Sequence, residues 1–192
     1  LKERPAILAA LRARFKYILV DEFQDTNWIQ YELVKTLAGN GDGLSVVADD
    51  DQSIYKFRGA SVANAMRFLD DYGQAQCIAL TKNYRSGQRI LDSAYACIKH
   101  NNPERLEVKK GINKRLISEV EEQGNVKIMF GEKQEDEDNF IIDEIRTLCA
   151  NGEYGNCAVL CRTNANVGHY AEMLDRAGIP VFAHVYRGLF VD

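Results

Sequence analysis

Two adjacent carboxylates, Asp21 and Glu22, come directly after a short apolar run near the start of the chain. The uninterrupted run at residues 17–20 favours a parallel strand that is buried on both faces. Ligands of open α/β sheets collect just beyond the carboxyl ends of such strands. One carboxylate could therefore hold a magnesium ion on nucleotide phosphates, while the other orients or deprotonates an attacking water. A solvated strand end is the alternative, and these residues alone do not decide between the two.

A second apolar run, residues 44–48, also ends in carboxylates, those of Asp49, Asp50 and Asp51. Three successive acidic residues cannot all be buried, so we expect some of them to cap a turn or to stay solvated. Gln52 follows them and is a candidate phosphate sensor. A metal-dependent phosphohydrolase that uses the carboxylates of both strand ends is another interpretation of the same residues.

Aromatic and basic side chains follow the second acidic run. Tyr55, Phe57 and Arg58 combine two aromatic faces with a guanidinium, which suits stacking on unpaired bases and contact with a phosphate. The spacing of Tyr55 and Phe57 fits equally well two core residues on one side of an extended segment. Further along, Tyr84 and Arg85 lie at a predicted strand-to-helix junction. An arginine there commonly holds phosphate, and a salt bridge to a nearby carboxylate is the alternative.

The elements that must position these side chains alternate between strands and helices. Apolar periodicity predicts helices at residues 5–15, 28–38, 62–69, 87–98 and 135–148, and a last one that ends at Gly178. It predicts strands at 17–20, 44–48, 77–80, 126–130, 157–161 and 181–186. Thr26 or Asn27 can cap the second helix, and Ser86 the fourth. Such alternation implies right-handed βαβ units and mainly parallel sheets, which is the α/β class.

Individual segments carry further expectations. The second helix would turn Ile29, Leu33, Val34 and Leu37 inward, and the acidic turn at 135–138 would complement the dipole of its helix. Between residues 104 and 124 charge density rises and periodicity fades, which predicts an exposed connection. The glycine-rich stretch 39–43 lacks a following Gly-Lys-Ser/Thr, so it predicts an ordinary turn rather than a phosphate-binding loop.

Composition narrows the class of protein. The 192 residues can bury a modest core, and no apolar stretch approaches the roughly 18 residues that span a membrane. Lys and Arg number 24 against 28 Asp and Glu, a net charge of −4, so any contact with nucleic acid must be local. The five cysteines form no CxxC motif, which disfavours a zinc site and suits reduced thiols in a cytoplasmic protein.

Three blocks of sequence together resemble motifs II, III and IV of the UvrD/Rep family of superfamily 1 DNA helicases. They are VDEFQDTN at 20–27, DDDQSIYKFRGA at 49–60 and NYRS at 83–86, in matching order and spacing, and weaker similarity runs through 160–164 to the end. The resemblance implies parts of two RecA-like parallel-sheet domains with flanking helices. Residues 1–72 would be the distal part of the first motor domain, with the Walker B strand and motif III. Residues 73–192 would be the proximal part of the second, from motif IV onward.

The resemblance implies an ATP-dependent enzyme that uses Mg²⁺, moves along single-stranded DNA in the 3′-to-5′ direction and unwinds duplex DNA. In the family pattern Asp21 binds magnesium, Glu22 activates the hydrolytic water and Gln52 senses the terminal phosphate. Tyr84 would stack on the adenine, and Arg85 would reach the terminal phosphate as an arginine finger.

The same resemblance places Tyr55, Phe57 and Arg58 along the path of single-stranded DNA. Arg162 and Asn164 would touch the DNA backbone from the second domain. The family usually has tryptophan at the position of Phe57, and phenylalanine still stacks, with a smaller face. The family also usually has glycine at position 48, where this chain has alanine.

Parts of the family pattern are absent from the sequence. It has no Walker A loop with its lysine and nothing that resembles motifs V and VI, so we expect an internal piece of a longer protein. Alone, this piece would bind ATP weakly and hydrolyse none, because no lysine and no loop of backbone N–H groups cradle the phosphates. A non-catalytic nucleic-acid or protein interaction module with helicase-like architecture is the alternative function. A RecB-type nuclease-helicase fits the DDDQS block less well.

Overall fold

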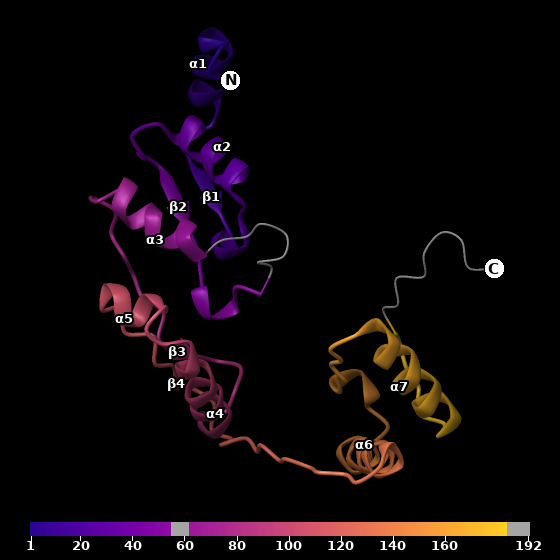
Figure 1. The fold of residues 1–192 in the computed structure, drawn as a ribbon. Helices are drawn as coiled ribbons and strands as arrows, with labels where there is room; N and C mark the ends of the chain where they lie inside the picture. The colour runs from indigo at the N-terminus through magenta and orange to yellow at the C-terminus, as the bar shows by residue number, and fades with distance from the viewer. Residues whose placement is uncertain (55–61, 184–192) are drawn as a thin grey trace, which may run out of the picture. The chain divides into compact units, whose positions relative to one another are not determined.

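The computed structural model describes residues 1–54 and 62–183. The chain forms two compact units, Leu1–Val126 and Lys127–Asp192, and each has a hydrophobic core of its own. Figure 1 shows the helices and strands of both units. Among the described residues, no helix is both long and apolar enough to cross a bilayer.

The first unit contains two parallel strands, β1 (Ile18–Val20) and β2 (Leu44–Val46), which pair with Ile18 opposite Leu44. Helix α1 (Pro5–Arg14) precedes β1, α2 (Trp28–Ala38) connects the strands, and α3 (Val62–Asp71) follows β2. The predicted strand–helix–strand unit with parallel pairing is therefore confirmed. The prediction that the first strand is buried on both faces is wrong. Val20 packs against the core, but the adjacent Leu19 points to the opposite face and is 71% exposed.

Local signals set the limits of α2. Asn27 forms the predicted cap: its Oδ1 accepts from the Gln30 backbone N–H at 3.0 Å, and the Gln30 side chain accepts from the Asn27 N–H at 2.9 Å. The helix ends at Ala38 with Gly39 as its C-cap, and the stretch 39–43 is a turn, as predicted. Gly43 has a φ of +76°, and a Cβ there would lie 2.3 Å from the Lys16 carbonyl oxygen. Glycine is required at this position because the turn approaches the start of β1 so closely.

The predicted inward face of α2 is wrong in part. Ile29 is 77% exposed and Leu33 is 48% exposed, whereas Tyr31 is fully buried. The reason lies in the packing partners of the helix, because α2 turns the Tyr31 side of its surface toward the residues that follow β1. Apolar periodicity indicates that a helix is amphipathic, but it does not fix which stripe meets the core.

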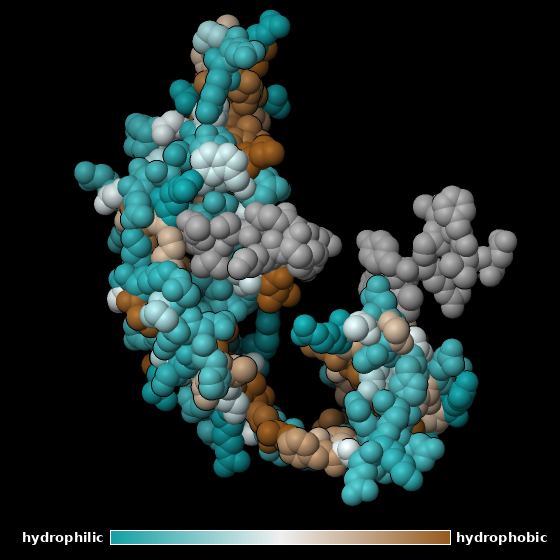
Figure 2. All heavy atoms as spheres, viewed as in Figure 1, coloured by the Kyte–Doolittle hydropathy of each residue, from teal (hydrophilic) through white to brown (hydrophobic). Residues whose placement is uncertain are grey.

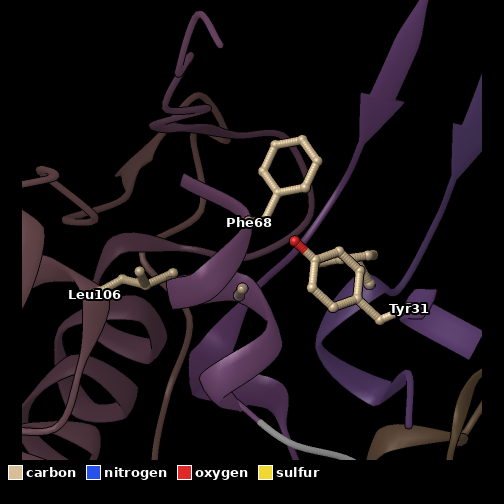
Figure 3. Close-up of a cluster of buried hydrophobic side chains, with 5 residues drawn as sticks. Tyr31, Phe68 and Leu106 are labelled. Atoms are coloured by element: carbon tan, nitrogen blue, oxygen red, sulfur yellow. The ribbon is translucent and has the colours of Figure 1, made fainter. Parts of the chain in front are cut away.

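The core of the first unit consists of Phe23, Tyr31, Ala65, Phe68 and Leu106 (Figure 3). The ring centroid of Phe23 is 5.4 Å from that of Tyr31 and 5.5 Å from that of Phe68, and both contacts are edge-on. Each such pair contributes about 0.5–1.5 kcal/mol beyond burial of area. Phe23 directly follows the carboxylates at the end of β1, so this core anchors the backbone from which they project.

The rest of the first unit holds a second parallel pair. Its elements are β3 (Lys82–Asn83), α4 (Gln88–Ile98), α5 (Leu106–Lys110) and β4 (Ile117–Ser118). The N-cap of α4 is Gly87, so the predicted Ser86 cap is wrong. The helix begins one residue later because Ser86 is held by β4, where the Ser118 hydroxyl donates to the Ser86 carbonyl at 2.9 Å.

The second unit is helical in its described part. Helices α6 (Gln134–Leu148) and α7 (Asn164–Arg176) pack around Ile145, Cys149, Leu174 and Ile179. The predicted acidic first turn of α6 is present. Ile145 of this helix is buried, whereas Leu148 is 70% exposed, because the chain buries Cys149 at the helix end instead.

The strands predicted at 77–80, 126–130 and 157–161 do not form in the described residues. Their apolar side chains are largely exposed, with Leu80 at 79%, Phe130 at 92% and Leu160 at 94%. Figure 2 shows that apolar atoms do reach the surface among hydrophilic ones. An apolar run becomes a strand only when a neighbour completes its hydrogen-bond ladder, and no described segment does so here. The last predicted strand, 181–186, runs beyond the described residues. The architecture is α/β with small parallel sheets.

Candidate functional site

The two acidic strand ends lie next to each other at one edge of the β1–β2 sheet. The Phe23 backbone N–H donates to the Val47 carbonyl at 2.9 Å, and the Val47 N–H donates to the Val20 carbonyl at 2.8 Å. These bonds extend the pairing just past both strands. Because the strands are parallel, the carboxylates that follow β1 and those that follow β2 emerge at the same edge.

Asp21 and Glu22 are both exposed at this edge. The Asp21 Oδ1 accepts from the Glu22 backbone N–H at 2.9 Å. Glu22 has a φ of +48°, in the left-handed region that residues other than glycine rarely adopt. Such a conformation costs about 1–2 kcal/mol, and strain of this kind concentrates at functional sites. The backbone turns sharply here and presents both carboxylates to solvent.

Gln24 links the two strand ends. It is only 1% exposed, its Nε2 donates to the Glu22 carboxylate at 2.6 Å, and its Oε1 accepts from the Asp49 backbone N–H at 3.0 Å. A buried amide must satisfy both its donor and its acceptor, and Gln24 does so by spanning the two acidic segments. Sequence reasoning missed this residue, because spacing does not reveal which polar side chain becomes buried.

Asp49, Asp50 and Asp51, called here the aspartate cluster, form the start of a 3₁₀ turn that ends at Gln52. Asp49 caps the turn, as predicted for part of the run: its Oδ1 accepts from the Asp51 N–H at 3.2 Å. Its Oδ2 accepts from the Gln52 side chain at 2.8 Å. Asp50 is buried, and its Oδ2 accepts from the Leu106 backbone N–H at 2.8 Å.

Two cations from the 104–124 segment neutralise part of this charge. Arg105 makes a bidentate pair with Asp51, with both N–O distances 2.7 Å, and its Nη1 lies 2.7 Å from Glu107. Lys114 Nζ lies 2.6, 2.5 and 2.8 Å from Asp49, Asp50 and Asp51 in turn. The prediction that residues 104–124 form an exposed connection is therefore wrong for this part. Charged residues of this segment form buried ion pairs. Sequence periodicity cannot distinguish charged residues that pair in this way from charged residues that are solvated.

Electrostatics favours the charged forms of Asp51, Lys114 and Arg105. Burial alone raises the pKa of the Asp51 carboxyl, but hydrogen bonds from Arg105 and Lys114 outweigh burial and leave that pKa below its usual value. Burial likewise lowers the pKa of Lys114, and its three aspartate partners more than offset this and raise it. The hydrogen bond to Asp51 is the largest of the effects that raise the pKa of Arg105.

Carboxylates at two places could hold a divalent cation. One oxygen from each residue of the aspartate cluster lies within 4.8 Å of the others, but the Lys114 ammonium already contacts all of them. Asp21 differs, because its Oδ2 has no hydrogen-bond donor among the described residues. An exposed carboxylate oxygen is the kind of ligand that Mg²⁺ uses beside phosphate oxygens. Asp21 therefore fits a magnesium ligand better than the aspartate cluster does.

Tyr84 and Arg85 are exposed at the end of β3. The turn there is held by the Asn83 side chain, whose Oδ1 accepts from the Arg85 N–H at 3.0 Å and the Ser86 N–H at 2.8 Å. Within the described part of the chain, the Arg85 guanidinium has no ion-pair partner, so it stays free to meet a ligand. No hydrogen bond joins Tyr84 or Arg85 to the acidic sheet edge in the same residues.

The structure describes two of the five predicted DNA-binding residues, Arg162 and Asn164. Tyr55, Phe57 and Arg58 lie outside the described residues. Arg162 and Asn164 are exposed in the second unit, where Asn164 is the first residue of α7 and follows the capping Thr163.

Comparison with known proteins identifies the family to which this chain belongs. Residues 1–73 match the UvrD/REP helicase N-terminal domain, and residues 78–190 match the UvrD-like helicase C-terminal domain. The chain belongs to the UvrD-like helicase family. The resemblance inferred from the three sequence blocks is thereby confirmed.

Individual relatives of this UvrD-like chain are helicases by name. DNA helicase II of Salmonella typhimurium is 41% identical over 187 residues, which cover 97% of this chain and 25% of the relative. The ATP-dependent DNA helicase PcrA of Leuconostoc citreum is 41% identical over 178 residues, 92% of this chain and 23% of the relative. UvrD1 of Mycobacterium tuberculosis is 40% identical over 185 residues, with the same coverage. The chain spans about a quarter of the length of these relatives.

Proposed function

We propose that this UvrD-like chain is part of an ATP-driven DNA helicase that moves 3′ to 5′ on single-stranded DNA and unwinds duplex DNA in the cytoplasm. The observation that carries the proposal is the linked pair of acidic strand ends, in which buried Gln24 connects Glu22 to the turn that presents Gln52. A water-activating carboxylate and a phosphate-sensing amide need such a fixed relation. The names of the relatives supply the substrates, ATP and DNA.

The residues at the sheet edge have separate roles in this proposal. Asp21 would hold Mg²⁺, which would supply positive charge at the nucleotide phosphates, and Glu22 would orient and deprotonate the attacking water. Gln52 contacts the terminal phosphate from the neighbouring turn. Tyr84 stacks on the adenine, and Arg85 stabilises charge on the phosphoryl group as an arginine finger. Tyr84 is 74% exposed, and Arg85 is exposed and forms no ion pair with the residues that the structure describes, which supports the last two roles.

The motor organisation is part of the same proposal. Residues 1–72 would form the distal part of the first RecA-like domain and residues 73–192 the proximal part of the second. The change from one family match to the next between residues 73 and 78 supports this division. Tyr55, Phe57 and Arg58 would line the single-strand path, with Arg162 and Asn164 on the DNA backbone. Without a Walker A lysine in its sequence, the 192-residue chain alone would not hydrolyse ATP.

DNA-stimulated ATPase activity of the complete natural protein that contains this sequence tests the proposal. Glu22→Gln and Arg85→Ala should each lower kcat by roughly 10² or more, and Glu22→Gln should keep ATP binding. Arg89→Ala is the matched control, because Arg89 is an exposed arginine on α4 close to Arg85. Equal rates in wild type and both site variants would favour a non-catalytic interaction module with helicase-like architecture.

A further inference from the structure

The aspartate cluster is held by a buried ionic contact that the proposed chemistry does not itself use. The Arg105 side chain is only 3% exposed and that of Lys114 is 16% exposed, and the Asp50 side chain, which Lys114 contacts, is 2% exposed. Arg105 is further fixed by Glu107, which also accepts from the Tyr95 hydroxyl at 3.0 Å. Long flexible cations are seldom buried in this way unless their geometry is fixed by several partners.

The contact leads directly to the proposed nucleotide site. Lys114 binds Asp49 Oδ1, the Gln52 side chain donates to Asp49 Oδ2, and the Asp49 backbone N–H donates to Gln24. Gln24 in turn donates to Glu22. A continuous series of hydrogen bonds therefore connects the Lys114 ammonium to both the phosphate-sensing amide and the water-activating carboxylate.

The contact also joins the two family segments. The aspartate cluster lies in the range that matches the N-terminal domain, and Arg105 and Lys114 lie in the range that matches the C-terminal domain. Both sets of residues belong to the first compact unit of the structure. A second, more exposed pair also spans the two ranges: Lys110 Nζ lies 2.6 Å from Asp70, whose side chain is 67% exposed.

We propose that Arg105 and Lys114 are positioning residues, which clamp the aspartate cluster across the two family segments and so hold Gln52 and Glu22 in their working geometry. The proposal rests on the proposed ATPase function. Neither cation needs to touch nucleotide. Each acts through a carboxylate: Arg105 fixes Asp51 in a planar bidentate pair, and Lys114 draws all three carboxylates toward one point.

Steady-state ATPase kinetics of the complete natural protein, with and without single-stranded DNA, test the role. Lys114→Gln should lower the DNA-stimulated kcat by about tenfold or more, with the KM for ATP changed less than about threefold. Lys114→Arg should recover most of the lost kcat, because it restores a cation that can reach several carboxylates. Lys110→Gln is the matched control, since it removes a lysine from the same segment and an ion pair between the same ranges.

A second variant distinguishes an effect on catalysis from an effect on folding. Arg105→Lys keeps the charge but loses the bidentate geometry, and it should lower kcat while the thermal midpoint stays near that of Lys110→Gln. An unchanged kcat in both Lys114→Gln and Arg105→Lys overturns the positioning role. The positioning role is also overturned if kcat falls only in variants whose thermal midpoint is lower and Lys114→Arg does not restore it. If the wild-type protein shows no DNA-stimulated ATPase at all, the proposed function itself fails, and the positioning role fails with it.

Discussion

Tyr31 offers a sharp test of how the first core is stabilised. Its ring is fully buried, and its hydroxyl donates to Asp71 Oδ2 at 2.6 Å. The same carboxylate oxygen accepts from Lys35 Nζ at 2.8 Å. Tyr31→Phe removes one hydrogen bond to a charged group and leaves the ring packing on Phe23 in place.

The expected cost follows from the surroundings of that bond. A hydrogen bond to a charged group contributes about 1.5–3 kcal/mol. Asp71 keeps Lys35 and its side chain is 27% exposed, so water can replace part of what is lost. We therefore expect Tyr31→Phe to lower the free energy of unfolding by about 1–2 kcal/mol. For a chain of this size that corresponds to roughly 2–8 °C in the thermal midpoint.

Urea unfolding of the purified chain measures this cost. Trp28 is the one tryptophan of the sequence, it begins α2, and the Arg67 guanidinium of α3 lies 5.1 Å from its ring, so its fluorescence reports on α2–α3 packing. Tyr72→Phe is the matched control, because the buried Tyr72 hydroxyl has no partner among the described residues. Removing that hydroxyl should be neutral or stabilising. Equal destabilisation by the two substitutions would refute the reasoning.

We also expect Tyr31→Phe to change how the free energy of unfolding depends on pH. The hydrogen bond from Lys35, followed by that from Tyr31, holds the pKa of Asp71 below its usual value. A depressed carboxyl pKa stabilises the fold above the unfolded pKa, about 3.9, and this stabilisation is lost as pH falls through the folded value. Burial raises the pKa of Tyr31, so wild-type stability should also fall as pH rises above about 10. Tyr31→Phe should therefore make the loss of stability at low pH smaller. It should also remove the part of the loss at high pH that comes from ionisation of Tyr31.

Two further predictions concern a helix cap and a thiol pair. Asn27→Ala removes the acceptor of the α2 capping box and should cost about 1 kcal/mol in the same urea assay, whereas Asn27→Asp should cost less. Equal losses would argue against the cap. Cys149 is buried, its Sγ lies 3.0 Å from that of Cys157, and this contact, followed by burial, raises its thiol pKa. Alkylation followed by peptide mass spectrometry should therefore label Cys149 more slowly than exposed Cys77, and equal rates would contradict the packing.

Much of the local structure could be predicted from short-range patterns. The capping box at Asn27, the turn at 39–43 and the helices α1, α2 and α6 follow from residues a few positions apart, and the structure contains them. The two acidic strand ends and the family could also be read from the sequence. Predicted strands at 77–80 and 126–130 failed because strand formation depends on a distant partner, which an apolar run does not specify.

By itself, the sequence determined the chemistry available at the sheet edge and its family, because residue types and spacing are local properties. Only the tertiary structure decided which carboxylates pair with which cations. Asp51 and Arg105 are separated by 54 positions, and no periodicity connects them. Likewise, only packing placed Gln24 in the interior, between Glu22 and Asp49. Burial makes such pairings obligatory, since a desolvated charge or amide must find a partner, but that requirement appears only once the chain has folded around it.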